Sequence, residues 1–147
     1  MIEKSDDAFT YLSYNIKNLC GYNENVRVIK GDVLNINSFS SLPDADIIVS
    51  NPPYIKSQEV PLLQKEVTFE PALALDGGSD GLIFYRYIIN KWSEKLKSDG
   101  EILFEIGEDQ GNDVSSLFKN KKFDTCVIKD YNNHDRIVIG RKVSDDI

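Results

Sequence analysis

Metal-binding and thiol chemistry have little to work with in this chain, which holds one histidine and two cysteines among 147 residues. Cys20 and Cys126 lie far apart and form no CxxC pair, so the sequence excludes the usual zinc sites and predicts no metal. No uninterrupted apolar run approaches the roughly 20 residues of a membrane-spanning helix, and the N-terminus has no apolar signal segment. Two free thiols and no signal peptide favour the cytoplasm, with no membrane partner.

Positive charge is also in short supply. The net charge is −7 and the isoelectric point is near 4.7. Binding to a phosphate backbone requires clustered lysine and arginine, so this balance disfavours a nucleic acid as partner. Hydrophobic residues make up 41% of the chain, which is enough for a sizeable core and excludes general disorder.

Strands and helices alternate along the predicted pattern. Apolar periodicity and turn residues first indicate a helix that begins at Ser5 or Asp6 and stops at Gly21, followed by strands at 26–29 and 46–50. A second helix runs from Leu82 to Leu96, with Ser79 or Asp80 as its cap and Gly100 as its stop. A strand at 102–106, a helix at 109–119, and strands at 125–128 and 136–139 complete the pattern. This alternation predicts an α/β fold with a largely parallel sheet. The last two strands leave no room for a crossover helix, so they should pair antiparallel.

The chemistry is concentrated in Asn51-Pro52-Pro53-Tyr54, directly after the buried strand 46–50. Ligands of open α/β sheets bind at this carboxyl edge. The side-chain oxygen of Asn51 and the backbone carbonyl of Pro52 can each accept one N–H of a planar amide or amine, which aims its lone pair toward an electrophile. Tyr54 and Pro53 complete a stiff, flat-sided binding segment. The alternative is a proline-rich turn with no chemical role.

These residues resemble the HemK/PrmC-type glutamine-N5 methyltransferases of peptide chain release factors. The likeness extends through Glu70-Pro71, Gly77-Gly78-Ser79-Asp80-Gly81, Glu105-Ile106-Gly107 and Asp135-Arg136-Ile137, and spans about Glu3 to Lys142. Asn51-Pro52-Pro53-Tyr54 alone also occurs in adenine-N6 and other amino methyltransferases, and the segment from Glu70 to Leu82 favours the glutamine type. The resemblance implies a class I Rossmann-like fold, S-adenosylmethionine as cofactor, and methylation of the glutamine in the Gly-Gly-Gln motif of a release factor, an enzyme of translation termination.

The resemblance also implies roles for individual residues. Asn51 and Pro52 would be catalytic and would hold the glutamine amide, with Pro53 and Tyr54 beside it. Glu3 would bind the cofactor ribose, Asp32 would lie near the adenine, and Asn51 would border the cofactor. Glu70 and Glu105 are candidate substrate contacts, although an exposed loop acid and a solvent-facing strand end explain them equally simply.

A glycine-rich GxGxG loop, which binds the cofactor in this family, occurs nowhere in the 147 residues. We therefore interpret residues 1–147 as the C-terminal part of one methyltransferase domain, and expect the chain alone to catalyse poorly. Residues 46–142 should form the more stable core. The strand at 46–50 should expose one edge, which allows a dimer through that edge.

Two other functions remain open at this point. A nucleic-acid amino methyltransferase, acting on adenine N6 or guanine N2, would use the same tetrapeptide, although the net charge disfavours it. A fragment without catalytic activity would retain only the substrate half of a site.

Overall fold

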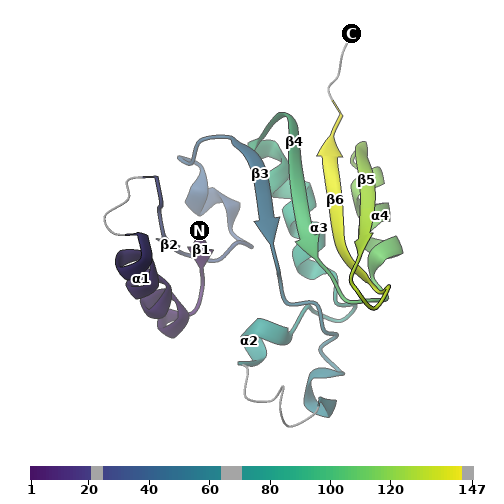
Figure 1. Ribbon diagram of the computed structural model, residues 1–147, viewed down its shortest axis with the longest axis horizontal. Coiled ribbons are helices and arrows are strands. Elements are labelled where there is room, and N and C mark those ends of the chain that lie inside the picture. The colour runs from purple at the N-terminus through teal and green to yellow at the C-terminus, as the bar shows by residue number, and fades with distance from the viewer. Residues whose placement is uncertain (21–24, 64–70, 144–147) are drawn as a thin grey trace. The chain divides into compact units, whose positions relative to one another are not determined.

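The computed structural model describes residues 1–20, 25–63 and 71–143, and Figure 1 traces the chain through them. The chain divides into two compact units, Met1–Leu42 and Pro43–Ile147, which we describe separately.

The first unit is built on two short parallel strands, β1 (Ile2–Glu3) and β2 (Ile29–Lys30). Backbone N–H groups of Ile29 and Gly31 donate to the carbonyls of Met1 and Glu3, both at 2.9 Å. The prediction of a strand at 26–29 is therefore wrong in its bounds. Pairing begins only at Ile29, because the partner strand β1 offers only two residues.

Helix α1 (Asp6–Cys20) joins these strands, and a 3-10 helix (Ile36–Phe39) follows them. The hydroxyl of Ser5 accepts the Ala8 N–H at 3.3 Å, so the helix begins where the sequence predicts. Asp6 and Asp7 in the first turn and Lys17 in the last complement the helix dipole. The predicted stop, Gly21, lies outside the described residues.

The second unit contains a four-stranded sheet in the order β3-β4-β6-β5 (Figure 1). Its strands are β3 (Ala45–Ser50), β4 (Leu96–Glu105), β5 (Phe123–Lys129) and β6 (Asp135–Lys142). β3 and β4 are parallel, whereas β6 pairs antiparallel with both β4 and β5. A strand at 46–50 and the antiparallel final pair are thus confirmed. The strand is not buried as predicted, since Ile47 and Val49 are 56% and 73% exposed. The sheet is mixed rather than largely parallel, because β6 lies antiparallel between β4 and β5.

Helices α3 (Ile83–Lys91) and α4 (Gly111–Lys119) pack on one face of this sheet (Figure 1). Tyr85 of α3 meets Phe104 of β4 edge-on, with ring centroids 5.0 Å apart. Phe118 of α4 lies between Phe104 and Phe123, at 5.6 and 5.5 Å. Fully buried Ile102 and Val138 complete this core, and aromatic burial of this kind dominates the stability of a small domain.

Helix α3 differs from its prediction at both ends. Its N-cap is Leu82, although the carboxylate of Asp80 does accept the Leu82 N–H at 3.1 Å. The helix continues as a 3-10 helix (Trp92–Lys95), and Leu96 already starts β4, so Gly100 lies inside a strand rather than at a helix stop. A register shift between Ala45 and Ile47 and a positive φ of 61° at Asp99 mark the irregular start of β4.

The connection from β3 to α3 is long and partly helical. Its described part contains a 3-10 helix (Val60–Leu62) and helix α2 (Ala72–Leu75). The turn between β5 and β6 is closed by Asp130, whose carboxylate accepts the N–H groups of Asn132 and His134 at 2.9 and 3.0 Å. His134 also forms an ion pair with Glu108.

Candidate functional site

The Asn51–Tyr54 segment leaves the sheet at its carboxyl edge. Ser50 is the last residue of β3 and lies opposite Phe104 of β4. Asn51, which follows Ser50, and Glu105, which follows Phe104, therefore lie at the same edge of the sheet. Asn51 is exposed and its side-chain amide has no hydrogen-bond partner among the described residues, while Pro52 is buried. An exposed amide beside a buried, stiff proline is suited to binding a planar ligand group.

The chain after Tyr54 docks onto the stretch before α3. Ile55 donates its N–H to Leu75 at 3.0 Å and accepts the Gly77 N–H at 2.8 Å. Ser57 completes this junction with two contacts: its N–H donates to the Gly78 carbonyl at 3.0 Å, and its hydroxyl donates to the Asp76 carboxylate at 2.7 Å. The hydroxyl of Ser57 and, next, the N–H of Gly78 hold the pKa of Asp76 below 3.8.

Two glycines allow this junction to close. A Cβ on Gly77 would lie 2.7 Å from the Cα of Tyr54, and one on Gly81 would lie 2.5 Å from the Tyr54 carbonyl oxygen. Gly81 also has a φ of 73°, which residues with side chains rarely adopt. The backbone of the Gly77–Gly81 turn therefore packs directly against the Asn51–Tyr54 segment.

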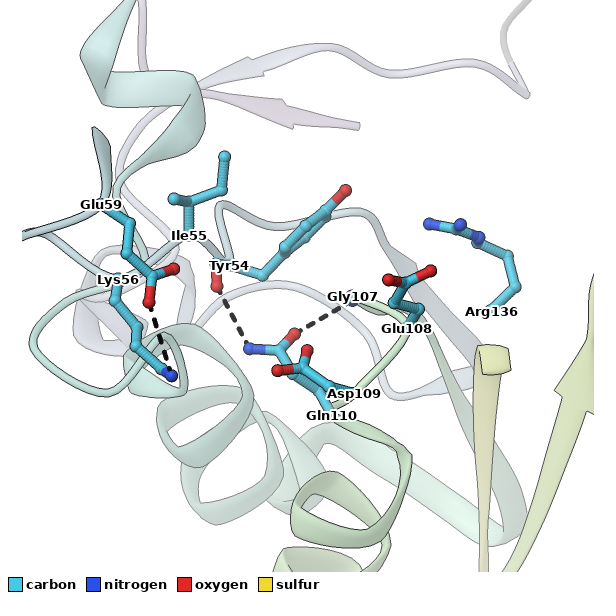
Figure 2. A pocket seen from close by; sticks show the side chains of 9 residues that line it. All are labelled: Tyr54, Ile55, Lys56, Glu59, Gly107, Glu108, Asp109, Gln110 and Arg136. Carbon is cyan, nitrogen blue, oxygen red and sulfur yellow. Dashed lines mark hydrogen bonds and ion pairs between the residues drawn. The ribbon is translucent and has the colours of Figure 1, made fainter. Parts of the chain in front are cut away.

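Gln110, at the N-terminus of α4, connects both of these segments to the end of β4. Its amide nitrogen donates to the carbonyls of Tyr54 and Gly81 at 3.1 and 3.3 Å, and its amide oxygen accepts the Gly107 N–H at 3.0 Å. Figure 2 shows the side chain lying between Tyr54 and Gly107. We did not predict a role for Gln110, because nothing in the local sequence distinguishes it from an ordinary turn residue.

Tyr85 connects α3 to the end of β4 and to Gln110. Its hydroxyl donates to the Glu105 carbonyl at 3.0 Å and lies 3.5 Å from the amide oxygen of Gln110. Burial, and then the neighbouring Tyr54 and Glu105, raise the pKa of Tyr85 above its usual range. Tyr85 therefore stays protonated and acts as a hydrogen-bond donor within the core.

An open pocket of about 290 Å³ lies beside Tyr54 (Figure 2). Its walls come from the segment after β3, the turn between β4 and α4, and β6, through Tyr54, Ile55, Lys56, Glu59, Gly107, Glu108, Asp109, Gln110 and Arg136. Lys56 and Glu59 approach to 3.6 Å, and Arg136 is 3.3 Å from Asp130, which does not line the pocket. The pocket is thus lined by Tyr54 together with side chains of both charge signs.

Glu105, a predicted substrate contact, is half-buried at the end of β4. It pairs with Ile137 of β6, so its side chain alternates away from the Phe104 face that carries the helices. The structure places Glu105 at the same sheet edge as Asn51 but shows no hydrogen bond between the two side chains. Glu70, the other predicted contact, lies outside the described residues.

Two of the three residues predicted at the cofactor, Glu3 and Asp32, lie at the paired strands of the first unit. Glu3 ends β1, and its carboxylate accepts the Ser5 N–H at 2.6 Å. Asp32 follows β2, pairs with Lys4 at 2.8 Å and accepts the Leu34 N–H at 2.9 Å. The bond from Lys4 lowers the pKa of Asp32 despite some burial. Glu3 thus ends one of two paired parallel strands, and Asp32 lies two residues after the other.

The residues that the structure describes contain no group of three or more histidine, cysteine, aspartate or glutamate side chains arranged to hold a metal ion. Among the same residues, no helix is long and apolar enough to cross a membrane.

Curated proteins with sequences similar to this chain share one name. No family model matches the chain. The chain is 39% identical to the release factor glutamine methyltransferase of Clostridium acetobutylicum over 92% of its own length and 48% of that protein. It is 38% identical to the enzyme of the same name from Caulobacter vibrioides, over 96% and 48%. The chain thus spans about half the length of these curated relatives, and the resemblance predicted from its motifs is confirmed.

Solved structures identify the fold. A methyltransferase from Pyrococcus furiosus matches over 97% of this chain and 61% of its own length, with a TM-score of 0.66 at 17% identity. A putative methyltransferase from Streptococcus mutans, in complex with SAH, matches 97% and 74%, with a TM-score of 0.57 at 16% identity. The chain therefore has a class I S-adenosylmethionine-dependent methyltransferase fold, of the Rossmann-like α/β type.

Proposed function

We propose that this chain is the C-terminal part of the catalytic domain of a release factor glutamine methyltransferase, which transfers a methyl group from S-adenosylmethionine to the side-chain nitrogen of a glutamine. One observation carries the proposal. The Asn51–Tyr54 segment follows the carboxyl end of β3, which is where α/β folds bind their ligands, in a chain that is 39% identical to such an enzyme. The substrate is the glutamine of the Gly-Gly-Gln motif of a release factor, in the cytoplasm.

Asn51 and Pro52 account for the reactivity of an otherwise weak nucleophile. An amide nitrogen attacks poorly because its lone pair is delocalised into the carbonyl. The side-chain oxygen of Asn51 and the carbonyl of Pro52 each accept one N–H of the substrate, which holds its lone pair toward the donor. These oxygens also stabilise the positive charge that develops on nitrogen, and the proton leaves after the N–C bond has formed.

The cofactor would bind through the edge formed by β1 and β2. Bound S-adenosylmethionine supplies an electrophilic methyl group. The half-buried carboxylate of Glu3 suits the paired hydroxyls of a ribose, since a carboxylate accepts two hydrogen bonds at once. Asp32, already held by Lys4 and the Leu34 N–H, would lie beside the adenine. Asn51 would border the methyl group from the substrate side.

The protein substrate would reach Asn51 and Pro52 past Tyr54, whose neighbouring pocket is lined by neither of those two residues. The ring of Tyr54 offers a flat wall for the glutamine amide, and Pro53 keeps that wall rigid. Glu105 is the proposed contact from β4, and Glu70 is a proposed contact from the connection between β3 and α3.

Methylation and binding assays test this function directly. The 147-residue chain, and a longer version that includes the upstream sequence, are titrated calorimetrically with S-adenosylhomocysteine and assayed with release factor and with RNA. We expect methylation of release factor glutamine by the longer version and weak or no turnover by the 147-residue chain. Methylation of RNA instead would establish the nucleic-acid alternative and overturn the proposal.

The variant Asn51→Ala separates the role of this residue from cofactor binding. Removing a hydrogen-bond acceptor that acts mainly in the transition state should reduce turnover on the order of 10²–10³-fold. Affinity for S-adenosylhomocysteine should change little. An equal loss of cofactor affinity would contradict the substrate-positioning role of Asn51.

A further inference from the structure

The buried side chain of Gln110 does more than start a helix. Gln110 is 7% exposed and occupies the N-cap of α4, yet its side chain makes no capping bond to that helix. Burial of a long polar side chain costs free energy unless its donors and acceptors are paired. The pairing that offsets this cost lies outside α4, in the segments that border the candidate site.

The contacts of Gln110 use the whole amide group. One nitrogen donates to two carbonyls, those of Tyr54 and Gly81, which are 56 and 29 residues away in sequence. The oxygen accepts the Gly107 N–H and lies near the Tyr85 hydroxyl. Both ends of the amide are thus engaged with protein groups, so Gln110 holds its neighbours in place.

These contacts fix the position of Tyr54 from two sides. The Gly81 backbone lies so close to the Tyr54 carbonyl that even a Cβ would not fit between them. The amide nitrogen of Gln110 donates to both the Tyr54 and the Gly81 carbonyl, and so ties together the two segments that meet there. Because two prolines make the preceding backbone stiff, a displacement of Tyr54 moves the Pro52 carbonyl with it.

We propose that Gln110 is a positioning residue, which sets the orientation of the Asn51–Tyr54 segment by bridging it to the Gly81 turn and to the end of β4. Its effect on methyl transfer rests on the proposed function. Its effect on the position of the segment rests only on the contacts above. The two parts are therefore tested by separate measurements.

The variant Gln110→Glu replaces the donating nitrogen with an oxygen that is negatively charged when ionised. The side chain keeps its shape, but at neutral pH a carboxylate oxygen then faces the carbonyls of Tyr54 and Gly81. Asn112→Asp is the matched control, because it makes the same amide-to-acid change two residues further along, at an exposed position. Gln110→Met, which lacks donors but has a similar length, replaces the glutamate variant if that protein does not fold.

Amide hydrogen exchange in the 147-residue chain tests the structural part. The N–H groups of Ile55 and Gly77, which bond across the junction, should exchange about tenfold faster in Gln110→Glu at pH 7. Lowering the pH should slow this exchange relative to Asn112→Asp, because protonation of the introduced carboxyl restores one donor. Unchanged exchange at Ile55 and Gly77 would overturn the inference.

Kinetics in the longer protein test the catalytic part. Gln110→Glu should lower kcat about 10- to 100-fold, as expected for a misplaced binding group, with affinity for S-adenosylhomocysteine unchanged and Asn112→Asp at the wild-type rate. A wild-type kcat despite faster exchange would overturn the catalytic part. Absence of methyl transfer in the wild type would instead overturn the proposed function, and exchange alone would then decide whether Gln110 positions the segment.

Discussion

Asp76 shows how a single carboxylate can make the site junction sensitive to pH. Its pKa is held below 3.8 by the Ser57 hydroxyl and the Gly78 N–H, both of which favour the charged form. A lowered pKa means that this stabilising contribution is fully present above the ordinary value and is lost as the pH falls through the lowered one. NMR titration of the Asp76 carboxyl carbon should therefore give a midpoint below 3.8.

The variant Ser57→Ala removes the main cause of this shift. The midpoint of Asp76 should then move back toward 3.8 while the Gly78 contact keeps part of the shift. A midpoint that does not respond to Ser57→Ala would contradict the assigned cause.

Sequence reasoning at the residue scale worked where the signal was local. Asn51–Tyr54 is contiguous and directly follows an apolar strand, so its place at the sheet edge could be predicted. Gln110 could not be found in this way, because its partners are 56 and 29 residues away and only the folded chain brings them together. The same holds for the pocket, whose walls come from three separate segments.

At the scale of elements, the Gly77–Gly81 turn sets how closely α3 can begin beside the site. Gly81→Ala would place a methyl group against the Tyr54 carbonyl at a φ of 73°. We expect the unfolding free energy to fall by about 1–3 kcal/mol, from strain and the forced displacement together. Denaturant unfolding measures this change. Ser79→Ala, an exposed neighbour in the same turn, should be close to neutral, and an equal loss in both variants would rule out the close packing as the cause.

Element boundaries were harder to predict than element types. Leu96 continues the helical spacing of Tyr85, Ile89 and Trp92, and all four are buried, so the pattern alone assigned it to the helix. The chain instead passes through a 3-10 helix and enters β4 at Leu96. A buried leucine fits either element, and pairing with Ala45 of β3 decides between them. Long-range pairing likewise shortened the strand predicted at 26–29.

At the scale of the whole molecule, nearly all of the described buried apolar residues lie in the second unit. Phe39 is the exception, whereas the aromatic cluster around Phe104 and Phe118 and the two helices that cover it lie between residues 83 and 123. Stability follows buried apolar area, so residues 46–142 should form the more stable part of the chain. The second unit also leaves Val49 of β3 73% exposed, and β3 pairs only with β4 among the described strands.

Hydrogen exchange on a dilute sample should resolve this difference. Amides in β4 and β6 should exchange at rates set by global unfolding, while those of α1 should exchange faster by at least about a hundredfold, because little buried area holds that helix. Slow exchange throughout α1 in a dilute monomer would contradict the expectation.

Raising the concentration tests the dimer predicted through the exposed edge of β3. A strand from a second copy, paired along β3, would slow exchange at that free edge and leave β6 unchanged. Equal rates in β3 at both concentrations would exclude edge pairing between copies over that range.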